Sequence, residues 1–205
     1  MDGIIFDVDG TLWDSTDSVA ESWNLALREH SSLDLVITGD ILSRLFGKTM
    51  TEIADAVFPT LGPEERMNLL DICYDYENRY LETHPGTVYP DALDTLRLLS
   101  EKYPLFIVSN CQKGYIEAMM KSCGMEPYIR DHLCFGETGQ PKSVTIRLLM
   151  ERNDLNDVVY VGDTQGDADA CRDAEVPFIF ASYGFGDVPD AEQKINKLSD
   201  LCDIF

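Results

Sequence analysis

The stretch GIIFDVDGTL, residues 3–12, places two aspartates and a glycine directly after a short apolar run. The apolar part is too short for a helix and is typical of a strand that is buried on both faces of a sheet. Asp7 and Asp9 follow it, and two carboxylates this close repel each other unless a cation or a shared proton compensates. Gly10 then allows the backbone to turn and to approach a ligand closely. Taken alone, the stretch is also compatible with a plain turn after a strand.

Two further apolar runs end in the same way. The run LFIV at residues 105–108 leads into Ser109 and Asn110, and the run VVYV at 158–161 leads into Gly162 and Asp163. A segment with helical character follows each run, which is typical of parallel strands in one sheet. Ligands of such sheets bind in the crevice beyond the carboxyl ends of the strands. We therefore expect five polar side chains to meet at one edge, those of Asp7, Asp9, Ser109, Asn110 and Asp163.

The two parts of the chain differ in their pattern, because residues 15–85 show only helical periodicity whereas strands and helices alternate from residue 86 onward. A helix opens at Pro90, with Leu93, Leu96 and Leu99 expected to face inward. The other elements expected beyond the runs above are strands at 133–135 and 177–181 and helices at 114–122, 143–152 and 167–174. We predict an α/β fold with a Rossmann-like parallel sheet core and helices on both faces (residues 1–14 and 86–205), plus an inserted all-helical cap domain (residues 15–85).

The formal net charge of the 205-residue chain is −21. Nucleic acids and anionic membranes repel such a surface, so neither is expected as a partner. No apolar stretch approaches the ~18 residues that span a bilayer, and the first strand begins too close to Met1 for a signal peptide. The six cysteines form no Cys-x-x-Cys pair, which favours free thiols in a reducing cytoplasm. We predict a cytoplasmic monomer or dimer, in which local groups hold an anionic ligand against the overall charge.

Lys142 stands out because it is the only lysine or arginine between Arg130 and Arg147 and begins a predicted helix. A cation is electrostatically unfavourable at the N-terminus of a helix. A nearby anion would explain its position, and an ordinary surface lysine is the alternative.

These motifs resemble the four signatures of the haloacid dehalogenase-like phosphohydrolases. The matching segments, in the order of the family, are DVDGT (7–11), VSN (108–110), Lys142 and GDTQGD (162–167). The helical insert after the first motif is similar to the family's small cap domain, and the chain most resembles the phosphoglycolate phosphatase-like group. It departs from the common pattern at Pro141, since a proline more often follows the lysine than precedes it.

The resemblance implies a role for each motif residue. Asp7 would be the nucleophile that forms an aspartyl-phosphate, and Asp9 the general acid and base; an aspartate at position 9 is typical of the phosphoryl-transferring members. The expected Mg²⁺ ligands are Asp7, the backbone carbonyl of Asp9, and Asp163. The expected phosphate-binding residues are Gly10, Ser109, Asn110 and Lys142. Asp167 would support the metal through a water, pair with Lys142 or cap the following helix.

Residues 45–49 (LFGKT) form the one segment of the predicted cap that we single out. Caps of the family place a substrate-specificity loop near this point, so Gly47 and Lys48 are expected to reach the substrate, although an ordinary exposed lysine is equally compatible with the pattern. Trp13, at the first junction with the cap, is a further candidate for lining the cleft.

The function that these residues favour is that of a Mg²⁺-dependent phosphatase acting on a small phosphorylated metabolite. A sugar-phosphate mutase has the same four motifs and is the alternative; a second phosphate clamped by Arg44 and Lys48 would favour it. A phosphonate hydrolase using a cap lysine as a Schiff base, and a binding module without catalysis, are weaker readings of the same sequence.

Overall fold

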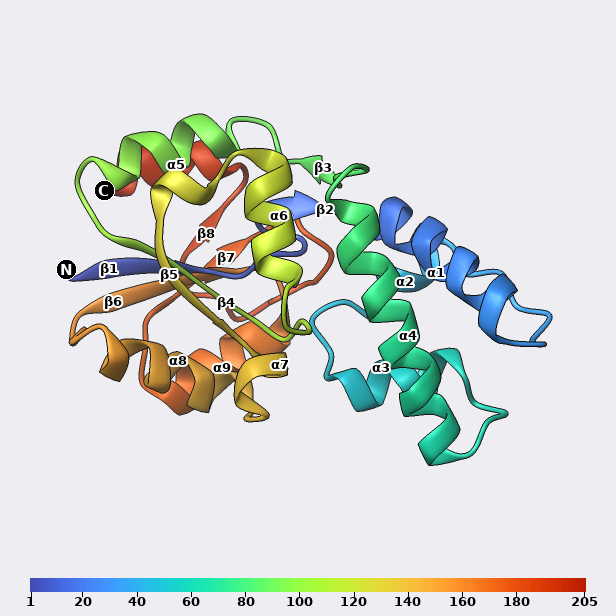
Figure 1. Ribbon diagram of the computed structural model, residues 1–205. Helices are drawn as coiled ribbons and strands as arrows, with labels where there is room; N and C mark the ends of the chain where they lie inside the picture. Colours follow the sequence, from blue (N-terminus) through green and yellow to red (C-terminus); the bar gives the residue numbers. More distant parts are fainter.

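The computed structural model describes residues 1–205 as a six-stranded sheet with helices on both faces and a group of helices beside it (Figure 1). All six strands are parallel, in the order β5-β4-β1-β6-β7-β8, so the first strand of the chain lies inside the sheet. The strands are β1 (Gly3–Phe6), β4 (Leu105–Ser109), β5 (Ile129–Cys134), β6 (Val158–Gly162), β7 (Phe178–Ala181) and β8 (Lys194–Ile195). The predicted α/β fold is confirmed.

The register of the three central strands brings their carboxyl ends level. Phe6, the last residue of β1, lies beside Ile107 of β4 and Val161 of β6. All three strands are buried along their whole length, which is why each reads as a continuous apolar run. The polar residues that follow them therefore emerge at one edge of the sheet.

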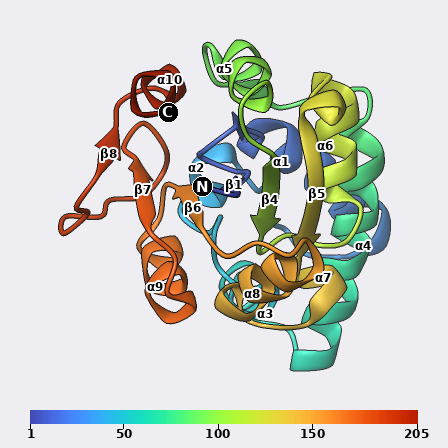
Figure 2. The same ribbon diagram turned by 90° about the vertical axis from the view of Figure 1, so that its left-hand side faces the viewer.

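Two hydrophobic cores lie on the two faces of this sheet. Ile4 and Ile107 pack with α5 (Ala92–Ser100) and α6 (Tyr115–Cys123) on one face. Ile5 and Phe106 pack with α8 (Lys142–Arg152) and α9 (Gln165–Ala174) on the other. Figure 2 shows both helical layers from the side on which the N-terminus lies. The short helices α7 (Phe135–Thr138) and α10 (Leu201–Ile204) complete the core.

Residues 15–85, called the helical segment below, lie beyond the carboxyl ends of the strands (Figure 1). The helices are α1 (Thr16–His30), α2 (Gly39–Leu42), α3 (Met50–Val57) and α4 (Pro63–Leu81). The rings of Trp23 and Tyr74 pack in a T-shaped arrangement between α1 and α4, with ring centroids 5.8 Å apart. The chain enters and leaves through an antiparallel ribbon of β2 (Trp13–Asp14) and β3 (Thr87–Val88). That the segment acts as a cap, with boundaries at 14/15 and 85/86, stays a prediction.

Two details expected from the sequence are wrong. The strand expected at 133–135 is β5, which already begins at Ile129. Leu93 is 38% exposed, whereas Leu96 and Leu99 are buried. At 100° per residue, Leu93 and Leu99 lie 120° apart around the helix axis, so one apolar stripe cannot bury both of them.

No helix in the chain combines the length and the apolar character that crossing a membrane requires.

Candidate active site

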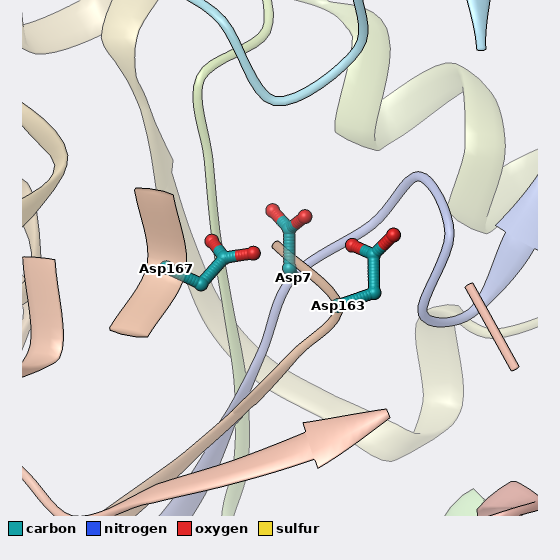
Figure 3. Close-up of side chains that lie close together, drawn as sticks. All are labelled: Asp7, Asp163 and Asp167. Atoms are coloured by element: carbon teal, nitrogen blue, oxygen red, sulfur yellow. The ribbon is translucent and has the colours of Figure 1, made fainter. Parts of the chain in front are cut away.

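Three buried carboxyl groups meet beyond the carboxyl edge of the sheet. Asp7 follows β1, Asp163 follows β6, and Asp167 lies in the first turn of α9. One carboxylate oxygen of each lies within 4.8 Å of the others, and Figure 3 shows the three side chains side by side. The predicted convergence of Asp7 and Asp163 is therefore present in the structure.

Lys142 is buried in this cluster and forms two ion pairs. Its Nζ donates to Asp7 Oδ1 at 2.9 Å and to Asp167 Oδ1 at 2.6 Å. Burial lowers the pKa of Lys142, but the charges of Asp167 and Asp7 outweigh burial and hold it above its ordinary value. This explains a lysine at the start of α8, because the anions that it needs come from β1 and α9.

Asp167 has both carboxylate oxygens occupied. Oδ1 accepts from Lys142, and Oδ2 accepts from the backbone N and the Oγ1 of Thr164, at 3.0 and 2.6 Å, in a capping box at the start of α9. Two of the three expected roles thus apply together, the pairing with Lys142 and the helix cap.

Asp163 has a buried oxygen without a partner. Its Oδ2 accepts from the backbone N of Phe185 at 2.7 Å, whereas Oδ1 has no hydrogen-bond partner. Burial, together with the charges of Asp7 and Asp167, raises the pKa of Asp163 to about 8. Burial also raises the pKa of Asp7 to about 6, against the opposing charge of Lys142. One ammonium does not balance three carboxylates, so the cluster fits a divalent cation that prefers oxygen ligands.

Gly10 serves this cluster in a way that differs from the prediction. Its φ is +81°, and a Cβ at this position would overlap Asp163 Oδ2. Its backbone N–H donates to the carbonyl of Trp13 at 2.9 Å, so this amide is not free for a phosphate oxygen. Glycine is needed here because the turn after β1 packs directly against Asp163.

Asp9 lies in a hydrogen-bond network that converges on one of its oxygens. Trp13 Nε1, Ser15 Oγ and Tyr115 OH all donate to Oδ1, at 3.0, 2.8 and 2.6 Å. Burial raises the pKa of Asp9 to about 7, and these donors limit the rise. The expectation that Trp13 lines the cleft is wrong, because the indole is fully buried and positions Asp9 instead.

Ser109 and Asn110 lie at the end of β4, where they line one pocket together with Asp7 and Asp9. Neither caps α6, since Cys111 to Gly114 separate them from the first residue of that helix. Both residues therefore contribute to the pocket without belonging to a helix N-terminus.

The loop of residues 45–49 reaches this pocket from the helical segment. The carbonyl of Gly47 accepts from Asn110 Nδ2 at 2.9 Å, and a Cβ on Gly47 would lie 3.1 Å from Thr164 Cγ2. Gly47 has φ +84°, which favours glycine. Lys48 lines the same pocket but its side chain is exposed and forms no ion pair. The loop therefore lies over the ends of β4 and β6, and contact of Gly47 and Lys48 with the substrate stays a prediction.

Several pocket residues were not found from the sequence, namely Trp23, Tyr74, Glu77, Gln112 and Tyr115. Among these residues, only Glu77 could have been recognised from the sequence pattern. Leu70, Tyr74, Glu77 and Leu81 follow each other at helical spacing, so a carboxyl group interrupts an otherwise apolar stripe of α4.

Comparison with known proteins agrees with this geometry. The model of the family described as haloacid dehalogenase-like hydrolase matches residues 4–181. The chain belongs to this family. The phosphoglycolate phosphatase of Rhodobacter capsulatus is 26% identical to the hydrolase and covers 97% of it, with 92% of the relative matched. That of Agrobacterium fabrum is 29% identical, covering 96% of the hydrolase and 87% of the relative. The chain is a phosphoric monoester hydrolase of the phosphoglycolate phosphatase-like subgroup.

Solved structures share the fold of the hydrolase. A haloacid dehalogenase-like family protein from Streptococcus pneumoniae has a TM-score of 0.83 at 18% identity, covering 100% of this chain and 98% of its own. A structure from Haemophilus somnus, described as a predicted phosphoglycolate phosphatase, has a TM-score of 0.85 at 20% identity, covering 100% and 97%. At these identities the likeness concerns the fold alone.

Proposed function

We propose that the hydrolase is a Mg²⁺-dependent phosphatase that cleaves a small phosphorylated metabolite through an aspartyl-phosphate at Asp7. One observation carries this proposal: Asp7 and Asp163 share a buried cluster in which an oxygen of Asp163 has no partner, and Asp9 lies in the same pocket as Asp7.

Asp7 would attack the phosphorus atom, and the P–O bond to the alcohol would break. The alcohol oxygen takes a proton from Asp9, which then removes a proton from the water that releases phosphate from Asp7. The first step needs an ionised Asp7 and a protonated Asp9. Burial raises the pKa of Asp9 to about 7, which favours its protonated form, and the charge of Lys142 favours the ionised form of Asp7.

Three groups would hold Mg²⁺: the carboxylates of Asp7 and Asp163 and the backbone carbonyl of Asp9. When bound, the ion would neutralise the charge that otherwise keeps carboxylate and phosphate apart. Lys142 keeps Asp7 ionised, and Ser109 and Asn110 offer donors to the phosphoryl oxygens. Residues 45–49 would keep bulk water out of the pocket.

The mutase alternative lacks support from the pocket. It calls for a second phosphate held by cations of the helical segment, but Arg44 is exposed and does not line the pocket, and Lys48 alone remains. A cytoplasmic location stays a prediction.

The test is phosphate release from a panel of phosphorylated metabolites, with and without Mg²⁺. We expect Asp7→Asn to lose about 10⁴-fold or more in kcat, because the nucleophile is gone. Asp34→Asn is the matched control, since Asp34 is exposed and lies outside the pocket. In Asp9→Asn, we expect radiolabel from an ester whose leaving group needs no proton, such as 4-nitrophenyl phosphate, to remain on the acid-quenched protein. Near wild-type turnover by Asp7→Asn would contradict the proposal.

A further inference from the structure

One wall of the pocket contains a carboxyl group for which the mechanism above has no use. Trp23, Tyr74 and Glu77 of the helical segment line it, together with Gln112 of the core. Glu77 is 3% exposed, and no lysine or arginine lies within ion-pair distance of it. Burying a carboxyl group without a cation costs free energy unless other groups compensate. A carboxyl group at position 77, on the apolar stripe of α4, therefore lowers the stability of the fold unless hydrogen bonds compensate for its burial.

Hydrogen bonds hold the carboxyl group of Glu77 in one orientation. Trp23 Nε1 donates to Oε2 at 2.5 Å, and Gln112 Nε2 donates to Oε1 at 3.0 Å. Gln112 Nε2 in turn donates to Asn78 Oδ1 at 3.0 Å. Partners on α1, α4 and the core thus fix a polar group that faces the pocket.

Glu77 belongs to the part of the pocket wall that the helical segment provides. The residues expected to bind the phosphoryl group, Asp7, Ser109 and Asn110, belong to the core. Glu77 lines the same pocket from α4 of the helical segment, so it is available to the rest of the substrate.

Lys142 is ion-paired with Asp7 and Asp167, and Lys48 belongs to the loop over the ends of β4 and β6. Lys48 is the one cation that lines the pocket together with Glu77, and no lysine or arginine forms an ion pair with the Glu77 carboxyl group.

These properties select among leaving groups. The carboxyl group of Glu77 can accept a hydrogen bond from a hydroxyl group in either protonation state, and burial, which raises its pKa to about 8, favours the form that can also donate. A hydroxyl group of the alcohol finds a partner there. A carboxylate of the alcohol at Glu77 would be desolvated beside a second carboxyl group, and the one cation of the pocket, Lys48, is exposed and screened by solvent.

We infer that Glu77 determines specificity by binding a hydroxyl group of the departing alcohol, so that the enzyme prefers monoesters of uncharged, hydroxylated alcohols to monoesters of carboxylated ones. This inference rests on the proposed phosphatase function. It assigns Glu77 to recognition of the leaving group and not to the chemical step.

The test compares three monoesters that differ in one terminal group: 2-hydroxyethyl phosphate, ethyl phosphate and phosphoglycolate. For the wild-type enzyme with Mg²⁺, we expect kcat/KM for 2-hydroxyethyl phosphate to exceed both others by about tenfold or more, because a site built for a hydroxyl rejects analogues that lack it. In Glu77→Met this preference over ethyl phosphate should disappear, so that the ratio of the two kcat/KM values falls to about one. In Glu77→Gln, which keeps a donor and an acceptor, most of the preference should return.

Asp75→Asn is the control, because Asp75 is an exposed carboxylate on the same helix. A wild-type enzyme that prefers phosphoglycolate, or a folded Glu77→Met with an unchanged preference, would overturn the inference. If Glu77→Met does not fold, the wild-type comparison and Glu77→Gln decide. Hydrolysis of none of the phosphomonoesters tested would instead contradict the proposed function.

Discussion

The hydrogen bonds of Asp9 indicate which of its two oxygens would carry the proton. Three donors occupy Oδ1, so the lone pairs of Oδ2 are the ones available for a proton to be transferred. Two of the donors, Trp13 and Ser15, follow Asp9 in the chain, and the third, Tyr115, comes from α6. The network thus orients the Asp9 carboxyl group and leaves Oδ2 free for proton transfer.

Replacing Tyr115 with phenylalanine tests this network. The hydroxyl of Tyr115 lowers the pKa of Asp9 by donating to it, so its loss should raise that pKa. We expect the alkaline limb of the kcat–pH profile of Tyr115→Phe to move to higher pH, because Asp9 keeps its proton longer. Tyr128→Phe, on the far side of the core from Asp9, should leave the profile unchanged. If the alkaline limb of the kcat–pH profile stays in place in Tyr115→Phe, the ionisation of Asp9 does not determine that limb.

Motif residues and their partners differ in how far they could be predicted. Asp7, Asp163 and Lys142 could be found because each follows a strand or begins a helix, and parallel topology brings such positions together. Tyr115 could not be found, because its contact with Asp9 joins positions 106 apart and depends on how α6 docks on the sheet. The expectation for Trp13 fails because a sequence does not tell on which side of a turn an indole packs.

The turn after β1 is the element on which the acidic cluster depends. In Gly10→Ala the new Cβ would meet Asp163 and the positive φ would be strained, so Asp163 must move. We expect kcat/KM to fall about 100-fold, as for a misplaced catalytic group, and the free energy of unfolding to fall by about 1–3 kcal/mol.

The control for that variant is Gly124→Ala at the end of α6. Gly124 has φ +69°, but a Cβ there would have no atom within 4 Å, so the substitution adds strain without a clash. Urea unfolding should show a loss of stability in both variants, and steady-state kinetics a loss of activity in Gly10→Ala alone. Equal kcat/KM values for Gly10→Ala and Gly124→Ala would show that catalysis does not depend on the exact position of Asp163.

The loop of residues 45–49 brings one cation of the helical segment to the pocket. In Lys48→Ala we expect KM for a phosphate monoester to rise about three- to tenfold with little change in kcat, because an exposed cation attracts the dianion but is screened by solvent. Lys194→Ala removes an equally exposed charge from β8 and should change neither constant. An unchanged KM in Lys48→Ala would show that Lys48 does not contribute to substrate binding.

Element types could be predicted better than their boundaries. The buried strands β1, β4 and β6 could be predicted almost to the residue, since continuous apolar runs are typical of central parallel strands. The strand β5 lies at the edge of the sheet, and three polar residues, Arg130 to His132, follow its first residue, so only its apolar end could be recognised in the sequence. The position of the helical segment over the strand ends depends on packing between distant residues and could be expected only from the family.

For the whole molecule, the buried acids make stability depend on pH. The pKa of Glu77 is raised from 4.5 to about 8 by burial, so between these values the unfolded chain releases a proton that the folded protein keeps. The free energy of unfolding should therefore decrease as the pH rises through this range. Below about 4.5 Glu77 is protonated in both states and its contribution is fully present.

Glu77→Gln isolates this effect, since the variant keeps every other titratable group. We expect the difference in unfolding free energy between variant and wild type to move in favour of the variant by a few kcal/mol, as an order of magnitude, between about pH 4.5 and 8. Urea titrations of both metal-free proteins across this range measure it. A difference that does not vary with pH would show that Glu77 is ionised throughout.

The ribbon of β2 and β3 offers a place at which this architecture could be engineered. Trp13 lies beside Val88 and Asp14 beside Thr87, so the two ends of a long insertion emerge next to each other. A foreign domain with similarly spaced termini could be grafted at this junction while the nucleophile and its lysine stay untouched. Such an exchange would transplant selectivity, provided that the graft also satisfies Gln112, whose amide is bonded to Glu77 in the native chain.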